Sequence, residues 1–339
     1  MDKRIFLSFC FLLFEINLIA CDICGCFMGI TPYDNQSSIS FLHRYRSYSG
    51  YRVYHQQPYY FPDGSFKTTN PASVFHGNGD TTKLSSYSAK DFEVYKVYEL
   101  RLKYFIHHRT ELNAYIPVNS NSSLNNGIKS SVTGIGDISI FGAYHLIKKV
   151  DYQVYQQRLI LGAGVKIPAG KNSVKGADDD RLPLLLQTGT GSLDYFTYIN
   201  YIGSYKKFGF GLNAIYKLNT ANNFGERVSN SSSGYFDVFY KLKVKDLIVI
   251  SSLKSYYEYT KGVITKGKLE ENTGMNVLLV GPGLDTYYKN IGVNLAFQFK
   301  VREQCSAYNL GSAGRLVLGV NYNFNQKKYL IKSKKDESN

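Results

Sequence analysis

The residues best suited to chemistry are three cysteines placed within six positions near the N-terminus. In "NLIACDICGCFMGITPYDNQ", residues 17–36, they are Cys21, Cys24 and Cys26. Thiolates at this spacing could bind a soft metal such as Cu(I) or Zn²⁺, and in an oxidising compartment they could form a disulfide. A Cys24–Cys26 bond would close a very tight loop, so Cys21–Cys24 or Cys21–Cys26 is the easier pairing. A processing junction is the third reading.

The segment before these cysteines has the layout of a secretory signal. Lys3 and Arg4 precede an apolar run over residues 5–14, which is too short to span a membrane and is followed by Glu15 and Asn17. Residues 1–20 are therefore predicted to be a cleaved signal peptide. "LIAC", residues 18–21, fits a lipobox that would make Cys21 a lipidated first residue, and ordinary cleavage after Ala20 is equally consistent. We rank the metal and disulfide readings behind this processing junction.

Residue combinations typical of catalysis are scarce in the remaining chain. There are six histidines, and the sequence contains no GxSxG nucleophile elbow and no HExxH pair. "GVKIPAGK" is not a phosphate loop, because five residues separate Gly164 from Gly170 where the motif requires four. We therefore expect no enzymatic activity and no cofactor.

The elements that must position any functional residue are predicted by alternation of apolar and polar residues. In "IGVNLAFQFKVR", residues 291–302, apolar side chains occupy every second position, and residues 157–167, 208–218 and 314–324 repeat the pattern. Strict alternation over this length is typical of strands with one apolar and one polar face. Such segments predict about twelve strands, near 38–52, 92–106, 109–118, 135–147, 157–167, 194–205, 208–218, 233–242, 246–259, 275–288, 291–302 and 314–324.

Strand length and connection length together predict the fold class. Several strands reach 10 to 15 residues, which suits a tilted membrane-spanning strand better than a soluble sheet. Long connections such as 53–91 and 168–193 alternate with tight ones such as 206–207 and 289–290. Outer-membrane barrels have this asymmetry, with short periplasmic turns and long outer loops. The chain is predicted to be all-β, an antiparallel transmembrane β-barrel with both ends in the periplasm.

Charge placement bears on the partner. The formal net charge is +14, but the basic residues gather in the short turns, in the C-terminal tail and on the polar strand faces rather than on a basic helix or a basic and aromatic array. No nucleic-acid partner is expected. The expected partners are outer-membrane lipid and a small-molecule solute. Basic residues outnumber Glu93, Glu99 and Asp137 on the face assigned to the lumen, which favours anionic solutes. The predicted pore-lining residues are Arg158, Lys166, Asn213, Lys217, Asn294, Gln298, Lys300, Arg302, Arg315 and Asn321.

Three internal motifs resemble a known family. "GIGDISIFGAYHL" (134–146), "LILGAGVKIPAGKNS" (159–173) and "LLQTGTGSLDYFTY" (185–198) occur in the order found in the outer-membrane transporter family named after the meta pathway of phenol degradation. The resemblance covers roughly residues 92–324 and implies a barrel in the bacterial outer membrane that passes small molecules. "CDICGCFMGITPYDNQ" resembles proteins of Bacteroidetes.

The sequence thus predicts four segments: a signal peptide (1–20), a Cys-rich periplasmic segment (21–37), a β-barrel (38–324) and a basic periplasmic tail (325–339). The function predicted from it is an outer-membrane channel or transporter for small, anionic solutes. The alternative is an envelope protein that handles a soft metal or thiol chemistry through "CDICGC", with the barrel as its anchor.

Overall fold

The computed structural model describes residues 36–51, 91–125, 127–151, 155–176, 179–270, 273–305 and 310–325. The predicted signal peptide, the three N-terminal cysteines and the C-terminal tail lie outside these residues. No helix within the described ranges is long and apolar enough to cross a membrane.

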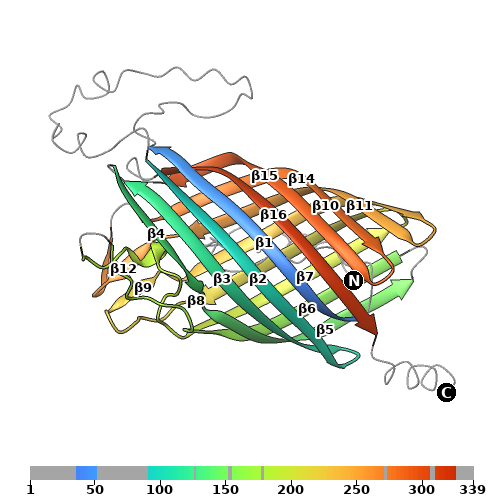
Figure 1. The fold of residues 1–339 in the computed structure, drawn as a ribbon. Helices are drawn as coiled ribbons and strands as arrows, with labels where there is room; N and C mark the ends of the chain where they lie inside the picture. Colours follow the sequence, from blue (N-terminus) through green and yellow to red (C-terminus); the bar gives the residue numbers. More distant parts are fainter. Residues whose placement is uncertain are drawn as a thin grey trace, which may run out of the picture.

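Twelve long antiparallel strands form a closed barrel (Figure 1). In sheet order they are β2 (Phe92–His107), β1 (Gln36–Tyr51), β16 (Leu310–Asn325), β15 (Ile291–Cys305), β14 (Met275–Tyr288), β11 (Leu247–Thr260), β10 (Ser231–Val244), β8 (Phe208–Leu218), β7 (Asp194–Tyr205), β6 (Tyr155–Ile167), β5 (Ile138–Asp151) and β3 (Thr110–Asn125). Pairing of β2 with β3 closes the cylinder. The predicted all-β antiparallel barrel of about twelve strands is confirmed.

The two ends of the barrel differ, as the alternating connection lengths predict. We name them the turn end and the loop end. At the turn end, tight connections carry Lys206, Lys245 and Lys289 with φ of 53°, 54° and 50°, the left-handed conformation that two-residue hairpin turns require. At the loop end lie the long connections, with a short 3₁₀ turn, η4 (Leu184–Leu186), between β6 and β7.

The loop end holds more regular structure than the sequence indicates. Residues 119–134 are predicted as a loop, but β3 continues to Asn125 and pairs with β4 (Ile128–Ile135), so the hairpin extends past the rim. Three short strands, β9 (Glu226–Val228), β12 (Val263–Thr265) and β13 (Lys268–Leu269), form a second small sheet from two further connections. Leu184, Val228 and Val263 pack together and tie η4 to this sheet.

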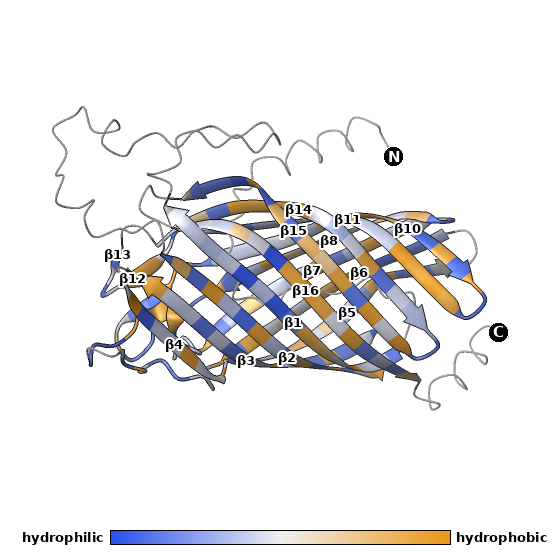
Figure 2. Ribbon diagram, turned by 45° about the horizontal axis from the view of Figure 1, so that its top comes forward, coloured by the Kyte–Doolittle hydropathy of each residue, from blue (hydrophilic) through white to orange (hydrophobic). Residues whose placement is uncertain are grey.

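Large apolar side chains are exposed along the strands of the barrel, and hydropathy alternates from residue to residue along these strands (Figure 2). Leu253, Leu295 and Val320, for example, are exposed. Near the turn end several of the exposed residues are aromatic, including Tyr205 and Tyr288, and the adjacent Lys206 and Lys289 ammonium groups lie 5.3 Å from those ring centroids. An apolar band edged by aromatic residues is the surface that a lipid bilayer solvates.

One lumen-facing glycine shows how the wall accommodates large side chains. A Cβ added to Gly162 on β6 would lie 2.1 Å from Cε1 of Tyr198 on β7, so the tyrosine ring lies directly over the glycine. The absence of a side chain at Gly162 lets Tyr198 lie against the wall, and Tyr198 packs there with Phe141 and Phe196.

Candidate functional site

The inner face of the barrel carries nearly all the residues predicted to line a pore. Lys300 and Asn321 are partly exposed. The others of this group are buried: Arg158, Lys166, Asn213, Lys217, Asn294, Gln298 and Arg315. The alternation of each strand therefore directs these polar side chains inward, as it predicts.

Arg302 is the exception, because its strand contains a bulge. Leu278 pairs with Arg302 and Leu279 with Lys300, so Val301 is an extra residue and the alternation shifts beyond it. Arg302 is exposed and lies in one cross-strand row with Leu278 and Tyr257, while the buried Leu279 faces the lumen. A bulge of this kind leaves no clear mark in the alternation pattern.

The lumen contains more buried carboxylates than the sequence analysis assigned to it. Among the described residues, the buried cations are Arg44, Arg46, Arg101, Arg158, Lys166, Lys217, Lys254 and Arg315, and the buried carboxylates are Asp91, Glu99, Glu111, Asp137, Asp194, Asp237, Glu258 and Asp285. The two sets balance, so the predicted basic excess is wrong for the buried lumen. Sequence reasoning missed Glu258 because the tyrosines beside it occupy both faces of β11, Tyr256 inside and Tyr257 outside.

Side chains from different strands meet across the lumen in its loop-end half. Arg46 on β1 pairs with Glu258 on β11, although β16, β15 and β14 separate these strands in the sheet. The Arg315 guanidinium lies 4.0 Å from the ring centroid of Tyr256 and 5.3 Å from that of Tyr235. An apolar cluster packs beside them, formed by Leu42, Tyr235, Tyr256, Val277, Leu279, Ala296 and Val317. These side chains therefore occupy part of the cross-section of the lumen at this level.

A polar ladder continues from this level along one wall. The Lys254 ammonium lies 3.0 Å from Asp285, which accepts a hydrogen bond of 2.8 Å from Asn294. Asn294 accepts in turn from Asn321 at 2.8 Å. Lys254 and Asp285 are fully buried, and each satisfies the other's charge, which is the condition for keeping ions in a low-dielectric interior.

A cavity of about 430 Å³ lies in the loop-end half of the lumen. Its walls come from both sides of the barrel: Arg44, Arg46 and Glu99 on β1 and β2, and the β6–β7 loop from Pro183 to Thr190. Tyr48, Tyr95, Tyr115, Leu184, Leu185, Val228 and Met275 also line it. This volume is within the range of small-molecule sites.

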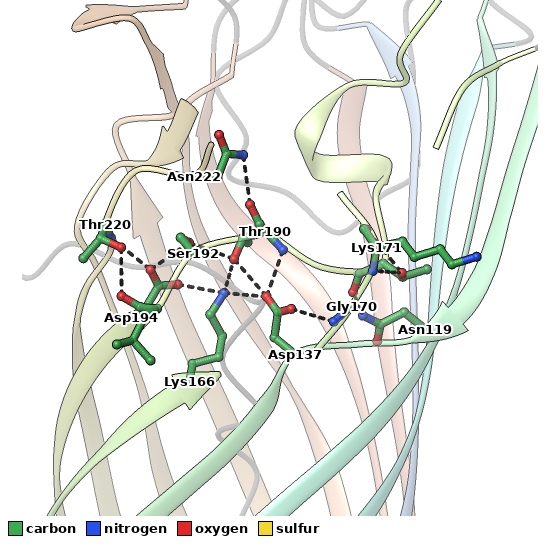
Figure 3. A network of polar contacts seen from close by, with 12 residues as sticks. Asn119, Asp137, Lys166, Gly170, Lys171, Thr190, Ser192, Asp194, Thr220 and Asn222 are labelled. Atoms are coloured by element: carbon green, nitrogen blue, oxygen red, sulfur yellow. Dashed lines mark hydrogen bonds and ion pairs between the residues drawn. The ribbon is translucent and has the colours of Figure 1, made fainter. Parts of the chain in front are cut away.

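The β6–β7 loop is held against the cavity by the network in Figure 3. Asp137, just before β5, accepts hydrogen bonds from the Gly170 and Thr190 backbone amides at 3.1 and 2.8 Å and from the Thr190 hydroxyl at 2.9 Å. The Lys166 ammonium lies 2.8 Å from Asp137 and 2.7 Å from Asp194. These residues come from the three Gly-rich motifs, so the motifs anchor a loop inside the barrel.

Side-chain amides hold the rest of the loop. Asn119 donates to the Thr188 carbonyl at 2.7 Å, and Asn121 donates to the carbonyls of Leu186 and Gln187, both at 3.1 Å. The Gln187 amide bonds back within the loop, to Val174 and Leu182. The leucines of η4 are therefore held in place as the apolar wall of the cavity.

One ion pair joins this loop to the small outer sheet. Arg181 lies 2.6 Å from Glu226 on β9, and its guanidinium lies 4.1 Å from the Phe224 ring centroid. The hydrogen bond from Arg181 is the main reason that the pKa of Glu226 lies below its ordinary value. The described parts of the β6–β7, β8–β10 and β11–β14 connections thus form one connected assembly beside the cavity.

The turn end is strongly basic. The acidic residues near this end, Glu111, Asp151, Asp246 and Asp285, are outnumbered by Lys103, Arg109, Lys148, Lys149, Arg158, Lys206, Lys207, Lys241, Lys243, Lys245 and Lys289. Lys241 follows the lumen-facing Phe239 in the alternation of β10, and it experiences the positive charges of Arg158 and Lys243. Among the residues that the structure describes, the basic excess therefore lies at this mouth rather than in the buried lumen.

The predicted metal, disulfide and lipidation sites at Cys21, Cys24 and Cys26 fall outside the described residues. Within the described ranges, no group of three or more His, Cys, Asp or Glu side chains is placed to hold a metal ion.

Comparison with known proteins supports the fold. No protein-family model matches the chain, and no curated protein matches it. Among solved structures, the chain is similar to an outer-membrane channel from Pseudomonas putida F1, with a TM-score of 0.58, 10% identity, and coverage of 86% of this chain and 96% of that one. It is less similar to the β domain of the Bordetella autotransporter BrkA (TM-score 0.43, 10% identity, 86% and 100% covered) and to the transport unit of the autotransporter AIDA-I from Escherichia coli (0.43, 11%, 90% and 95%).

The Pseudomonas protein is a channel of the phenol-degradation type, the family that the three internal motifs resemble. The relation to Bacteroidetes proteins stays a prediction. At this level of identity, the protein shares the fold of an outer-membrane channel.

Proposed function

We propose that the protein lies in the bacterial outer membrane and passes small solutes through its lumen. The observation that carries the proposal is the cavity of about 430 Å³ enclosed within a closed barrel whose outer face is apolar. A barrel that served only as an anchor would have no need to keep charged side chains around an internal cavity. The likeness to the Pseudomonas channel supports the same reading.

We further propose that passage favours anions and that the preference arises at the turn end. Buried lumen charges balance, but Lys241 and Lys243, which are not among those buried charges, contribute positive charge at the turn-end mouth. A mouth lined by charge of one sign concentrates the opposite ion and raises its rate of entry. The predicted lumen residues act in this scheme as a neutral, hydrogen-bonding wall behind the charged mouth.

The test is the reversal potential across a planar bilayer under a KCl gradient. Wild type is expected to prefer chloride, and the double variant Lys241→Gln, Lys243→Gln is expected to have a measurably smaller chloride preference without losing conductance. Lys129→Gln, an exposed lysine of β4 at the loop end, is the matched control and should behave like wild type. Cation preference in the wild-type protein would contradict the anion proposal while leaving the channel intact.

A further inference from the structure

Arg44 is a buried arginine of the cavity wall that lacks a strong partner. It lines the cavity, it is 7% exposed, and its Nε has no hydrogen-bond partner. Its one ion pair among the described residues is with Glu99, at 3.6 Å, which is beyond hydrogen-bonding distance. A buried guanidinium with unused donors is costly unless something binds to it.

The carboxylates of the cavity do not supply that partner, because each has a closer donor. The Arg101 Nε atom forms an ion pair with the Glu99 carboxylate at 2.5 Å, and the Arg101 guanidinium lies 4.4 Å from the Tyr115 ring centroid. Glu258 pairs with Arg46, and Asp137 with Lys166.

Glu93 is the remaining acidic group of the lining. It accepts a hydrogen bond of 2.7 Å from Tyr95. Val97 is the residue opposite Arg44, so Glu93 lies four positions away, about 13 Å along β2. The Arg44 guanidinium is therefore available to a ligand.

The side chains around Arg44 indicate the chemistry of the remainder of that ligand. Polar side chains such as Asn119 and Ser123 also line the cavity, but aromatic and aliphatic side chains form a continuous part of its wall, including Tyr115, Val97 and the leucines of η4. The asparagine and glutamine bonds described above fix those leucines in place. Guanidinium and carboxylate match in a bidentate arrangement, while an apolar wall favours a hydrocarbon body.

We propose that the cavity binds an organic monocarboxylate with an apolar body, its carboxylate on Arg44 and its hydrocarbon portion against the η4 leucines. The inference deepens the proposed function and rests on it, since the bound molecule is a solute on its way through the barrel. It separates this site from the basic mouth: the mouth attracts anions in general, and the cavity retains those with an apolar portion.

The test is calorimetric titration of the full-length protein in lipid nanodiscs, with heats from empty nanodiscs subtracted. The probes are octanoate, its uncharged analogue octanamide, and acetate. Octanoate is expected to bind saturably, and octanamide and acetate at least about tenfold more weakly, because the first lacks the charge-assisted pair and the second lacks the apolar body. Equal binding of octanoate and octanamide, or no binding of octanoate, would overturn the proposal.

Variants assign the effect to Arg44. Arg44→Gln is expected to weaken octanoate binding by about tenfold or more and to leave octanamide unchanged; Glu99 keeps Arg101, so no buried carboxylate is orphaned. Arg44→Lys should recover part of the loss. Arg302→Gln, the same substitution at an exposed site, should bind octanoate like wild type. Unaltered octanoate binding by Arg44→Gln would refute the site.

The readout does not depend on conduction, so the two proposals fail separately. A barrel that conducts ions but does not bind octanoate would overturn this site alone. A barrel that binds octanoate through Arg44 but never conducts would keep the site and overturn the channel.

Discussion

Replacing Asp137 with alanine should release the β6–β7 loop from the barrel wall without unfolding the barrel. Asp137 accepts hydrogen bonds from two backbone amides and one hydroxyl of that loop, at 2.8 to 3.1 Å. Lys166 would keep Asp194 at 2.7 Å, so the substitution leaves no buried unpaired cation. The cost therefore falls on the hydrogen bonds between the loop and the wall.

The magnitude follows from these three bonds. Hydrogen bonds to a charged group contribute about 1.5–3 kcal/mol each, and neighbouring bonds are not additive, so the lower end of the range applies. The free energy of opening the loop should fall by about 3–5 kcal/mol. That corresponds to roughly a 100- to 4,000-fold increase in the population of the open loop.

The assay is hydrogen exchange of the protein in nanodiscs, followed by mass spectrometry of peptides from residues 170–190 and from β14–β16. Asp137→Ala should accelerate exchange in the loop peptide and leave the strand peptides unchanged. Asp180→Ala, at an exposed aspartate of the same loop, is the control and should exchange like wild type. An unchanged loop, or equal acceleration in loop and strands, would refute the reasoning.

Three further predictions concern pH, packing and lipid contact. The pKa of Glu226 is lowered by Arg181, so this contact stabilises the loop assembly above the ordinary glutamate pKa and is lost as the pH falls through the lowered value; limited proteolysis of the outer loops should therefore increase in acid. Gly162→Ala forces a Cβ into the Tyr198 ring and should reduce the free energy of unfolding in urea by about 1–3 kcal/mol. Leu295→Arg places a charge on the lipid face and should cost about 2–4 kcal/mol on refolding into liposomes.

Each of these has a matched control. Glu226→Gln should make loop proteolysis nearly independent of acid pH, and a persistent acid response would contradict the assignment. Gly142→Ala, where the nearest atom to the added Cβ is 4.0 Å away, should change stability little; a loss as large as that of Gly162→Ala would count against the packing argument. Leu269→Arg, exposed in the loop-end sheet, should be tolerated, and equal costs at both leucines would contradict the lipid-facing assignment.

The strands could be predicted from the sequence because each has an apolar face toward the outside of the barrel and a polar face toward the lumen. Ile291, Val293 and Leu295 alternate with Gly292, Asn294 and Ala296, and the barrel places the two sets on opposite faces. The β3–β4 extension could not be predicted in this way. In "NSNSSLNNGIKSSV" both faces of the hairpin are largely polar, since the hairpin lies beyond the rim, and the alternation that marks a strand is absent.

The site was harder to predict because it depends on contacts distant in sequence. Arg46 pairs with Glu258 across the lumen, and Asp137 holds Thr190; neither pairing has a local signal. The bulge at Val301, which places Arg302 away from the lumen, also has no local sequence signal. Alternation identifies which face a residue occupies, but not whether its charge is already matched by a residue from another strand.

The most direct test of the account is single-channel recording of the refolded protein in a planar bilayer. A difference in electrophoretic mobility between heated and unheated samples would first establish that the barrel has folded. The account predicts discrete, small conductance steps, because Arg46, Glu258 and the stacked Arg315 and Tyr256 narrow the lumen. It also predicts larger steps for Asp137→Ala, in which the loop is released. A folded barrel that conducts nothing, as wild type or as Asp137→Ala, would contradict the claim that solutes pass through the lumen.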